Sequence, residues 1–200
     1  TGIYAATAIL AAIVQRGRTG EGQHIDMDLM DVATSIMANQ AMNYLATGTA
    51  PRKMGNAHPN LAPYAVFDCA DGWLILATGN DSQYRKLCAI LGLPEMAEAP
   101  EFLTNADRIA NRDEMTRRLT EATRRFTKAE LLAACEAEGV PAGPINDMGE
   151  VFADPQIVAR GMQINAQGVP GVRTPITFSG AELALDAPSP RLGQHQDLIA

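Results

Sequence analysis

The chain has 200 residues, which is enough for one sizeable hydrophobic core or two small ones. Apolar residues make up 46% and charged residues 20%, proportions typical of a globular protein in water. The formal net charge of -7 at pH 7 argues against nucleic acid or an anionic membrane as a partner, because both are bound by basic surfaces. Four arginines cluster locally, but on this acidic background they indicate a solvated helix face: Arg117, Arg118, Arg124 and Arg125.

The three cysteines, Cys69, Cys88 and Cys135, are widely spaced, and no pair has the C-x-x-C spacing. They therefore suggest neither a zinc site nor a disulfide framework. We expect a reducing, cytoplasmic compartment, no bound metal and no cofactor.

The first predicted element is a helix over residues 3–14, which are rich in Ala, Ile and Leu. A helix that is apolar all round is expected to be buried on all sides. Because the chain opens with Thr1-Gly2, we expect the covering partner to lie N-terminal to residue 1. The apolar run ends at Gln15 and Arg16, so it is too short to cross a bilayer, and it lacks the cleavage site of a secretion signal.

Residues 17–22, Gly-Arg-Thr-Gly-Glu-Gly, are similar to a phosphate-binding loop. They lack the Lys-Ser/Thr ending, and they follow a helix instead of opening one. A helix C-terminus carries partial negative charge and repels phosphate. A plain helix-to-strand turn is the favoured interpretation.

Residues 24–29 alternate between polar and apolar side chains, which predicts a strand with two aspartates on its polar face. Asp31 is expected to cap a helix over residues 32–46. Asp26, Asp28 and Asp31 could instead bind magnesium or calcium through their carboxylates. Because the third aspartate is better used as a helix cap, a solvated face is favoured over a metal site.

Residues 54–64 interrupt the regular patterning with a glycine, two prolines, two asparagines and a histidine. The prolines remove backbone donors and favour extended geometry before them, which predicts a stiff, exposed loop that presents Asn56, His58 and Asn60. A functional loop on a rigid scaffold and an ordered interdomain connection both remain open. A histidine base needs a second group to orient it, and the neighbouring residues offer none. His58 is therefore interpreted as a loop-packing residue that donates one hydrogen bond.

Beyond the loop, residues 64–68 and 73–78 are apolar runs joined through Asp71-Gly72, which predicts a β-hairpin. Helices follow, and Gly92 and Gly139 are expected to end two of them. The helix starts are indicated by caps, capping boxes or a proline: Asp81, Asn111 with Glu114, Thr127 with Glu130, and Asp154-Pro155. The tail is expected to be short strands and extended chain.

Single motifs do not define an active site, since G-x-S-x-G, H-E-x-x-H and G-x-G-x-x-G are all absent. Taken together and in order, however, a series of short segments covers essentially the whole chain. They are Thr1–Ala6, Ala11–Ile13, Arg16–Gln23, Ile25–Leu29, Gly55-Asn56, His58-Pro59, Ala62–Tyr64, Asp71-Gly72, Gly79–Asp81, Asn111-Arg112, Gly139–Pro144 and Asp154–Gln156. This series resembles the class III CoA-transferases, the group of L-carnitine dehydratase and bile-acid-inducible protein F.

The resemblance implies an α/β plus α+β fold from an interlocked homodimer. Residues 1–50 would be the C-terminal part of a large Rossmann-like domain, and residues 51–63 a linker and active-site loop. Residues 64–165 would form a small α+β domain of a hairpin and helices, and residues 166–200 a segment returning toward the large domain. The chain is expected to be a C-terminal fragment that lacks the N-terminal, CoA-binding half.

The resemblance also implies an enzyme that moves coenzyme A between carboxylic acids. In such transferases an aspartate attacks the acyl-CoA, giving a mixed anhydride and then an aspartyl-CoA thioester, which conserves the energy of the thioester. That aspartate is expected a few residues before Thr1, so no catalytic nucleophile lies in this chain, and the chain alone is expected to be inactive. Its partners would be acyl-CoA and carboxylic acids.

Residues 56–60, Asn56, Ala57, His58, Pro59 and Asn60, match the family's substrate-shielding loop, which keeps water from covalent intermediates. Here His58-Pro59-Asn60-Leu61 stands in place of a glycine run, so large opening motions are not expected. This version looks closer to the carnitine-type transferases than to the racemases. An α-methylacyl-CoA racemase and a non-catalytic binding or dimerisation module are the alternatives.

Overall fold

Contacts divide the chain between Gly55 and Asn56 in the computed structural model, which describes residues 1–198. The chain is mixed α/β, in agreement with the predicted class at that level. The two units are described separately. The finer domain limits expected at residues 50, 63 and 165 stay predictions.

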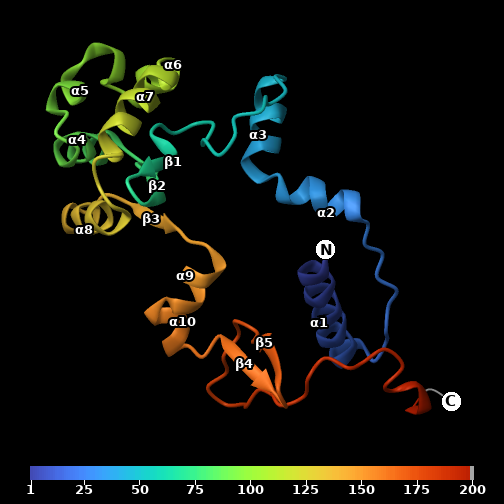
Figure 1. Cartoon of the computed structure of the whole chain (residues 1–200). Coiled ribbons are helices and arrows are strands. Elements are labelled where there is room, and N and C mark those ends of the chain that lie inside the picture. Colours follow the sequence, from blue (N-terminus) through green and yellow to red (C-terminus); the bar gives the residue numbers. More distant parts are fainter. Residues whose placement is uncertain (199–200) are drawn as a thin grey trace. The chain divides into compact units, whose positions relative to one another are not determined.

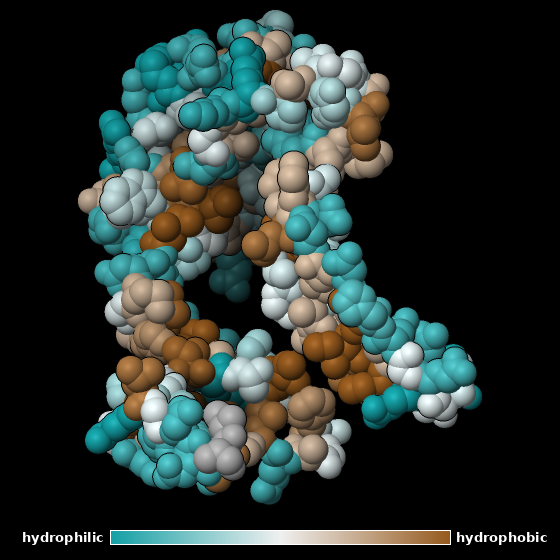
Figure 2. Space-filling model, turned by 90° about the vertical axis from the view of Figure 1, so that its right-hand side faces the viewer, coloured by the Kyte–Doolittle hydropathy of each residue, from teal (hydrophilic) through white to brown (hydrophobic). Residues whose placement is uncertain are grey.

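The first unit is helical, with α1 (Gly2–Thr19), α2 (Leu29–Ile36) and α3 (Ala38–Thr47). Gly20 ends α1 in the left-handed conformation, with φ of 77°, and its N–H donates to the carbonyl of Arg16 at 2.8 Å. The predicted first helix is therefore present, but none of its residues is buried in this structure. Val32 is the one apolar residue of residues 1–55 that is buried. Figure 2 shows apolar side chains at the surface of the molecule.

The predicted strand at residues 24–29 is wrong, because no strand forms anywhere in residues 1–55. The alternating pattern is there, but an isolated extended segment has no neighbour to take up its backbone hydrogen bonds. The predicted cap is also displaced: Asp28, not Asp31, accepts from the N–H of Met30 at 2.7 Å. The helix expected over residues 32–46 is broken at Met37 into α2 and α3.

The second unit is built on a three-stranded antiparallel sheet in the order β1-β2-β3 (Figure 1). The predicted hairpin is confirmed, with β1 at Tyr64–Cys69 and β2 at Gly72–Ala77, and with Cys69 opposite Gly72 at the turn. Strand β3 (Ala142–Ile145), which was not predicted, pairs with β2. Strand β1 therefore lies at one edge of the sheet.

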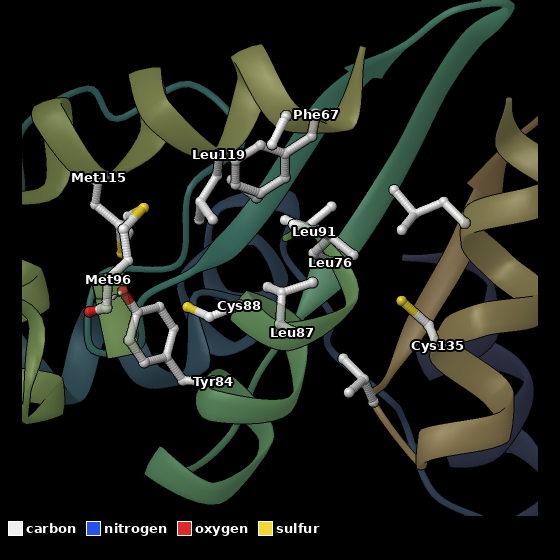
Figure 3. Packing of buried hydrophobic residues seen from close by; sticks show 14 of the residues in the cluster. Phe67, Leu76, Tyr84, Leu87, Cys88, Leu91, Met96, Met115, Leu119 and Cys135 are labelled. Carbon is white, nitrogen blue, oxygen red and sulfur yellow. Dashed lines mark hydrogen bonds between the residues drawn. The ribbon is translucent and has the colours of Figure 1, made fainter. Parts of the chain in front are cut away.

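Helices pack with this sheet around one core. They are α4 (Asp81–Ile90), α5 (Pro94–Glu98), η1 (Pro100–Phe102), α6 (Asn105–Ala110), α7 (Arg112–Thr123) and α8 (Lys128–Glu138). Phe67 of β1 and Leu76 of β2 point into the core, as strand alternation requires. They share one buried cluster with Leu87 of α4, Leu119 of α7 and Cys135 of α8 (Figure 3). The main hydrophobic core therefore lies between this sheet and its helices, and is called the sheet-and-helix core.

The helix caps confirm one predicted capping box and correct the other. Thr127 and Glu130 form the expected box at the start of α8. Asn111 makes no side-chain cap with α7, and Thr104 instead forms a box with Asp107 at the start of α6. The side chain of Asn111 is drawn away because its Nδ2 donates to the carbonyls of Glu101 and Asp107, each at 3.0 Å.

The rest of the chain consists of short elements, as the sequence predicts for the tail: α9 (Met148–Ala153), α10 (Pro155–Ala159), β4 (Gln163–Ala166), β5 (Val169–Val172) and η2 (Gln196–Leu198). Strands β4 and β5 form a separate antiparallel pair. Pro155 occupies the first turn of α10 behind the capping Asp154, as predicted. Within residues 1–198, none of the helices combines the length and apolar character that a bilayer crossing requires.

Candidate functional site

The loop at residues 56–60 lies against the open edge of β1. The side-chain oxygen of Asn56 accepts from the N–H of Val66 at 3.0 Å, and the N–H of His58 donates to the carbonyl of Tyr64 at 2.9 Å. Both partners on β1 point away from β2, so the loop takes the place of a further strand. Ala57, between them, packs partly buried against the core.

Two groups close in the chain hold the side chain of His58, although no orienting group was evident among its neighbours from the sequence. Its Nδ1 accepts from the N–H of Asn60 at 3.1 Å. Its ring stacks on Tyr64, with the centroids 5.0 Å apart and the planes 19° from parallel. Because Nδ1 is an acceptor, the proton of the neutral imidazole lies on Nε2. The histidine is thus oriented, with Nε2–H as a hydrogen-bond donor.

Helix α6 supplies two side chains that hold the end of the loop. Asn105 donates from Nδ2 to the carbonyl of Asn60 at 2.9 Å and accepts at Oδ1 from the N–H of Ala62 at 3.1 Å. Arg108 donates from Nε to the carbonyl of Ala62 at 2.7 Å and pairs with Asp81 at 2.6 Å. Arg108 is only 1% exposed, so both contacts are shielded from water on its side.

Helix α7 adds Arg112, whose guanidinium donates to the carbonyl of Pro59 at 3.2 Å and to that of Leu61 at 3.4 Å. Burial lowers the pKa of Arg112, and the nearby Asp113 opposes this only in part. Among residues 1–198, no carboxylate forms an ion pair with Arg112. The guanidinium of Arg112 therefore binds the backbone carbonyls of Pro59 and Leu61.

Other candidates from the sequence are not assembled into a site. Residues 1–198 contain no group of three His, Cys, Asp or Glu side chains placed to hold a metal ion, and Asp28 serves as a helix cap. In the arginine cluster, Arg117 and Arg118 pair with Glu114, and Arg124 pairs with Asp68. These pairs agree with the solvated helix face that the sequence predicts.

Comparison with known proteins identifies the family to which the chain belongs. The profile of the family described as CoA-transferase family III matches residues 1–196. The chain belongs to CoA-transferase family III. The chain is also 50% identical, over 201 residues, to a succinate–glutarate CoA-transferase of Agrobacterium fabrum, with 98% of this chain and 50% of that protein covered.

A further relative and a solved structure agree. The chain is 36% identical to an acetyl-CoA:oxalate CoA-transferase of Acetobacter aceti, with 96% of this chain and 50% of that protein covered. Among solved structures, a CaiB/BaiF family protein from Brucella suis superposes with a TM-score of 0.83 at 53% identity, covering 100% of this chain and 53% of that one. The chain spans about half the length of the family relatives it matches.

Proposed function

We propose that this chain is part of an acyl-CoA transferase that moves coenzyme A between dicarboxylic acids such as succinate and glutarate. The observation that carries the proposal is the 50% identity with a succinate–glutarate CoA-transferase along 98% of the chain. Identity at this level over a continuous span supports a shared reaction more strongly than a shared fold does. The transferase names of the other relatives support it over a racemase.

The nucleophile in this proposal is an aspartate expected a few residues before Thr1. Its carboxylate oxygen attacks the thioester carbon of the donor, and CoA leaves as the thiolate. The thiolate then attacks the aspartyl carbonyl of the mixed anhydride, which releases the donor acid and forms the aspartyl-CoA thioester. Transfer to the acceptor acid reverses these two steps, so each bond that is broken is replaced.

The loop of residues 56–60 is assigned the task of keeping water from these intermediates, because an anhydride or thioester that meets water is lost by hydrolysis. Its contacts support a shield that stays in place. Asn56 and His58 are bonded to β1, and Asn60 is bonded to Asn105 of α6. A loop anchored at both ends suits a cover better than a hinged lid.

The assembly proposed with this function is a cytoplasmic homodimer of interlocked chains, with residues 1–50 in a Rossmann-like domain. The exposed apolar side chains of the first unit support a protein partner for that unit, since large apolar patches are uncommon on monomers. Ile3 is 84% exposed and Leu45 73% exposed. Light scattering on the protein at its full natural length checks the dimer, and a monomeric mass would contradict it.

The decisive experiment supplies the full-length protein with succinyl-CoA and glutarate. We expect stoichiometric formation of glutaryl-CoA and succinate by chromatography and mass spectrometry, and a covalent CoA adduct on an aspartate. Butyrate, of similar length but with one carboxylate, is the matched acceptor control and should react poorly. Absence of exchange with any dicarboxylate, or epimerisation of a 2-methylacyl-CoA instead, would overturn the proposal.

The shielding task has its own test. Asn56→Ala removes the acceptor for Val66 and should loosen the cover, so that a larger share of succinyl-CoA is hydrolysed per transfer event. The ratio of free CoA to glutaryl-CoA reports this directly. An unchanged ratio in an Asn56→Ala enzyme would argue against a shield at this loop. Residues 1–200 alone should exchange no CoA.

A further inference from the structure

Hydrogen bonds link three groups at the loop of residues 56–60. They are the guanidinium of Arg112, the peptide group between Pro59 and Asn60, and the imidazole of His58. Arg112 donates to the carbonyl oxygen of Pro59 at 3.2 Å. The N–H of that same peptide group belongs to Asn60, and it donates to Nδ1 of His58 at 3.1 Å. One peptide unit therefore links the cation to the histidine ring.

This arrangement acts on the histidine through the polarity of the peptide. A cation at the carbonyl oxygen draws electron density toward that end and makes the N–H a better donor. The strengthened donor favours the imidazole form in which Nδ1 is the acceptor, so the proton is kept on Nε2. Tyr64, stacked on the ring at 5.0 Å, fixes the plane in which Nε2–H points.

If Arg112 served only to fasten the loop, its positive charge would be unnecessary. The adjoining peptide groups are already held by Asn105, a neutral side chain that both donates and accepts. Within residues 1–198 this cation forms no ion pair with a carboxylate, and partial burial of such a cation opposes folding. The same burial lowers the pKa of Arg112. A neutral side chain could fasten the loop without that penalty.

We propose that Arg112 is a positioning residue for His58, and that His58 offers its fixed Nε2–H as a hydrogen-bond donor to a carboxylate oxygen of the acid substrate. The inference rests on the proposed transferase function. Among residues 1–198, Nε2 of His58 has no hydrogen-bond partner, whereas Nδ1 is occupied. A neutral N–H donor suits this substrate because it binds the anionic oxygen without transferring a proton to it.

The kinetic test uses the full-length enzyme with succinyl-CoA and glutarate. His58→Phe keeps a ring to stack on Tyr64 but loses both nitrogens, and should lower kcat/KM for glutarate roughly 10- to 100-fold, the range for a hydrogen bond to a charged group. Arg112→Gln should lower it by less. In the double variant the loss should equal that of His58→Phe alone, because Arg112 acts through His58.

A matched control lies on the same helix. Arg117→Gln makes the same chemical change at an exposed side chain that faces Glu114 and Glu121, and should leave kcat/KM within about twofold of the wild type. Losses from Arg112→Gln and His58→Phe that multiply in the double variant would overturn the proposal. Arg112→Lys keeps the charge and should therefore be more active than Arg112→Gln. It takes the place of Arg112→Gln in the test if Arg112→Gln does not fold.

A second readout does not depend on turnover. Nitrogen-15 NMR of ring-labelled histidines, with His58 assigned from the spectrum lost in His58→Phe, should show an unprotonated Nδ1 and a protonated Nε2. Glutarate should shift the Nε2 signal in the wild type. A proton on Nδ1, or no response to glutarate, would overturn the inference even in an enzyme that transfers CoA. Failure of exchange together with the expected NMR result would instead count against the transferase proposal.

Discussion

Removal of the Arg108 side chain should destabilise the sheet-and-helix core more than any change at the surface. The guanidinium is 1% exposed and donates to the carbonyls of Ala62, Phe102 and Leu103 at 2.7, 3.0 and 3.3 Å. In Arg108→Met, the carbonyls of Ala62 and Phe102, whose bonds to Arg108 are buried, lose their donors at about 1–3 kcal/mol each. The bond to Leu103 is only partly buried and contributes less. The pair with Asp81 adds little, because that carboxylate is 45% exposed. We expect a total loss of about 3–5 kcal/mol, mostly from the buried carbonyls.

Hydrogen exchange followed by mass spectrometry on the full-length protein measures this loss locally. The amides of Leu74 and Leu76, in the central strand, exchange only when the core opens. A loss of about 3–5 kcal/mol corresponds to exchange that is faster by about 100-fold or more. The measurement requires no assumption that the whole protein unfolds in one step.

Two companion variants separate the contributions. Arg117→Met removes an exposed arginine and should leave exchange of the central strand within about threefold of the wild type, the effect of about 0.5 kcal/mol. Asp81→Asn removes the ion pair alone and should fall well short of Arg108→Met. An Arg108→Met protein whose central strand exchanges as slowly as that of Arg117→Met would refute the assignment of Arg108 to the core.

Three further outcomes follow from burial and charge. Burial raises the pKa of the Cys88 and Cys135 thiols to about 11, so iodoacetamide at pH 8 should label them only after denaturation, and rapid labelling of the native protein would contradict this. Leu119→Ala should lower the free energy of unfolding by about 2–5 kcal/mol, measured by the same exchange experiment. Hydrogen bonds from Arg117 and Arg118 lower the pKa of Glu114 from 4.5 to about 2. The difference in free energy of unfolding between the wild type and Glu114→Gln should therefore be full above about pH 4.5 and vanish as the pH falls through 2. Unfolding measured over a series of acidic pH values checks this.

Local signals in the sequence were sufficient for the β1-β2 hairpin and for the start of α8, whose hydrogen bonds are local. The hairpin follows from two apolar runs around Asp71-Gly72, because the turn brings together strands that are adjacent in the chain. The capping box of Thr127 and Glu130 closes within three residues. The pattern alone was not sufficient at Asn111 and Glu114, where the Asn111 side chain bonds to the carbonyls of Glu101 and Asp107 instead of capping α7.

Elements that depend on a distant partner were not predictable in the same way. The alternation in residues 24–29 is typical of a strand, but an extended segment becomes a strand only beside another one. The residues that orient the loop lie far along the chain: 43 positions separate Ala62 from Asn105, and 53 separate Pro59 from Arg112. Of these loop partners, Arg112 belongs to the Asn111-Arg112 segment of the family resemblance, but the resemblance assigns it no contact.

The docking of the loop on β1 has a consequence for the behaviour of the protein in concentrated solution. A bare edge strand is a template on which the strands of other molecules can pair. Asn56 and His58 occupy the outward-facing groups of Val66 and Tyr64, so this edge is closed by the chain's own backbone and side chains. A more mobile, glycine-rich loop would leave that edge open each time it moved. Variants selected for faster loop motion should therefore begin to aggregate through β1 before they lose their fold.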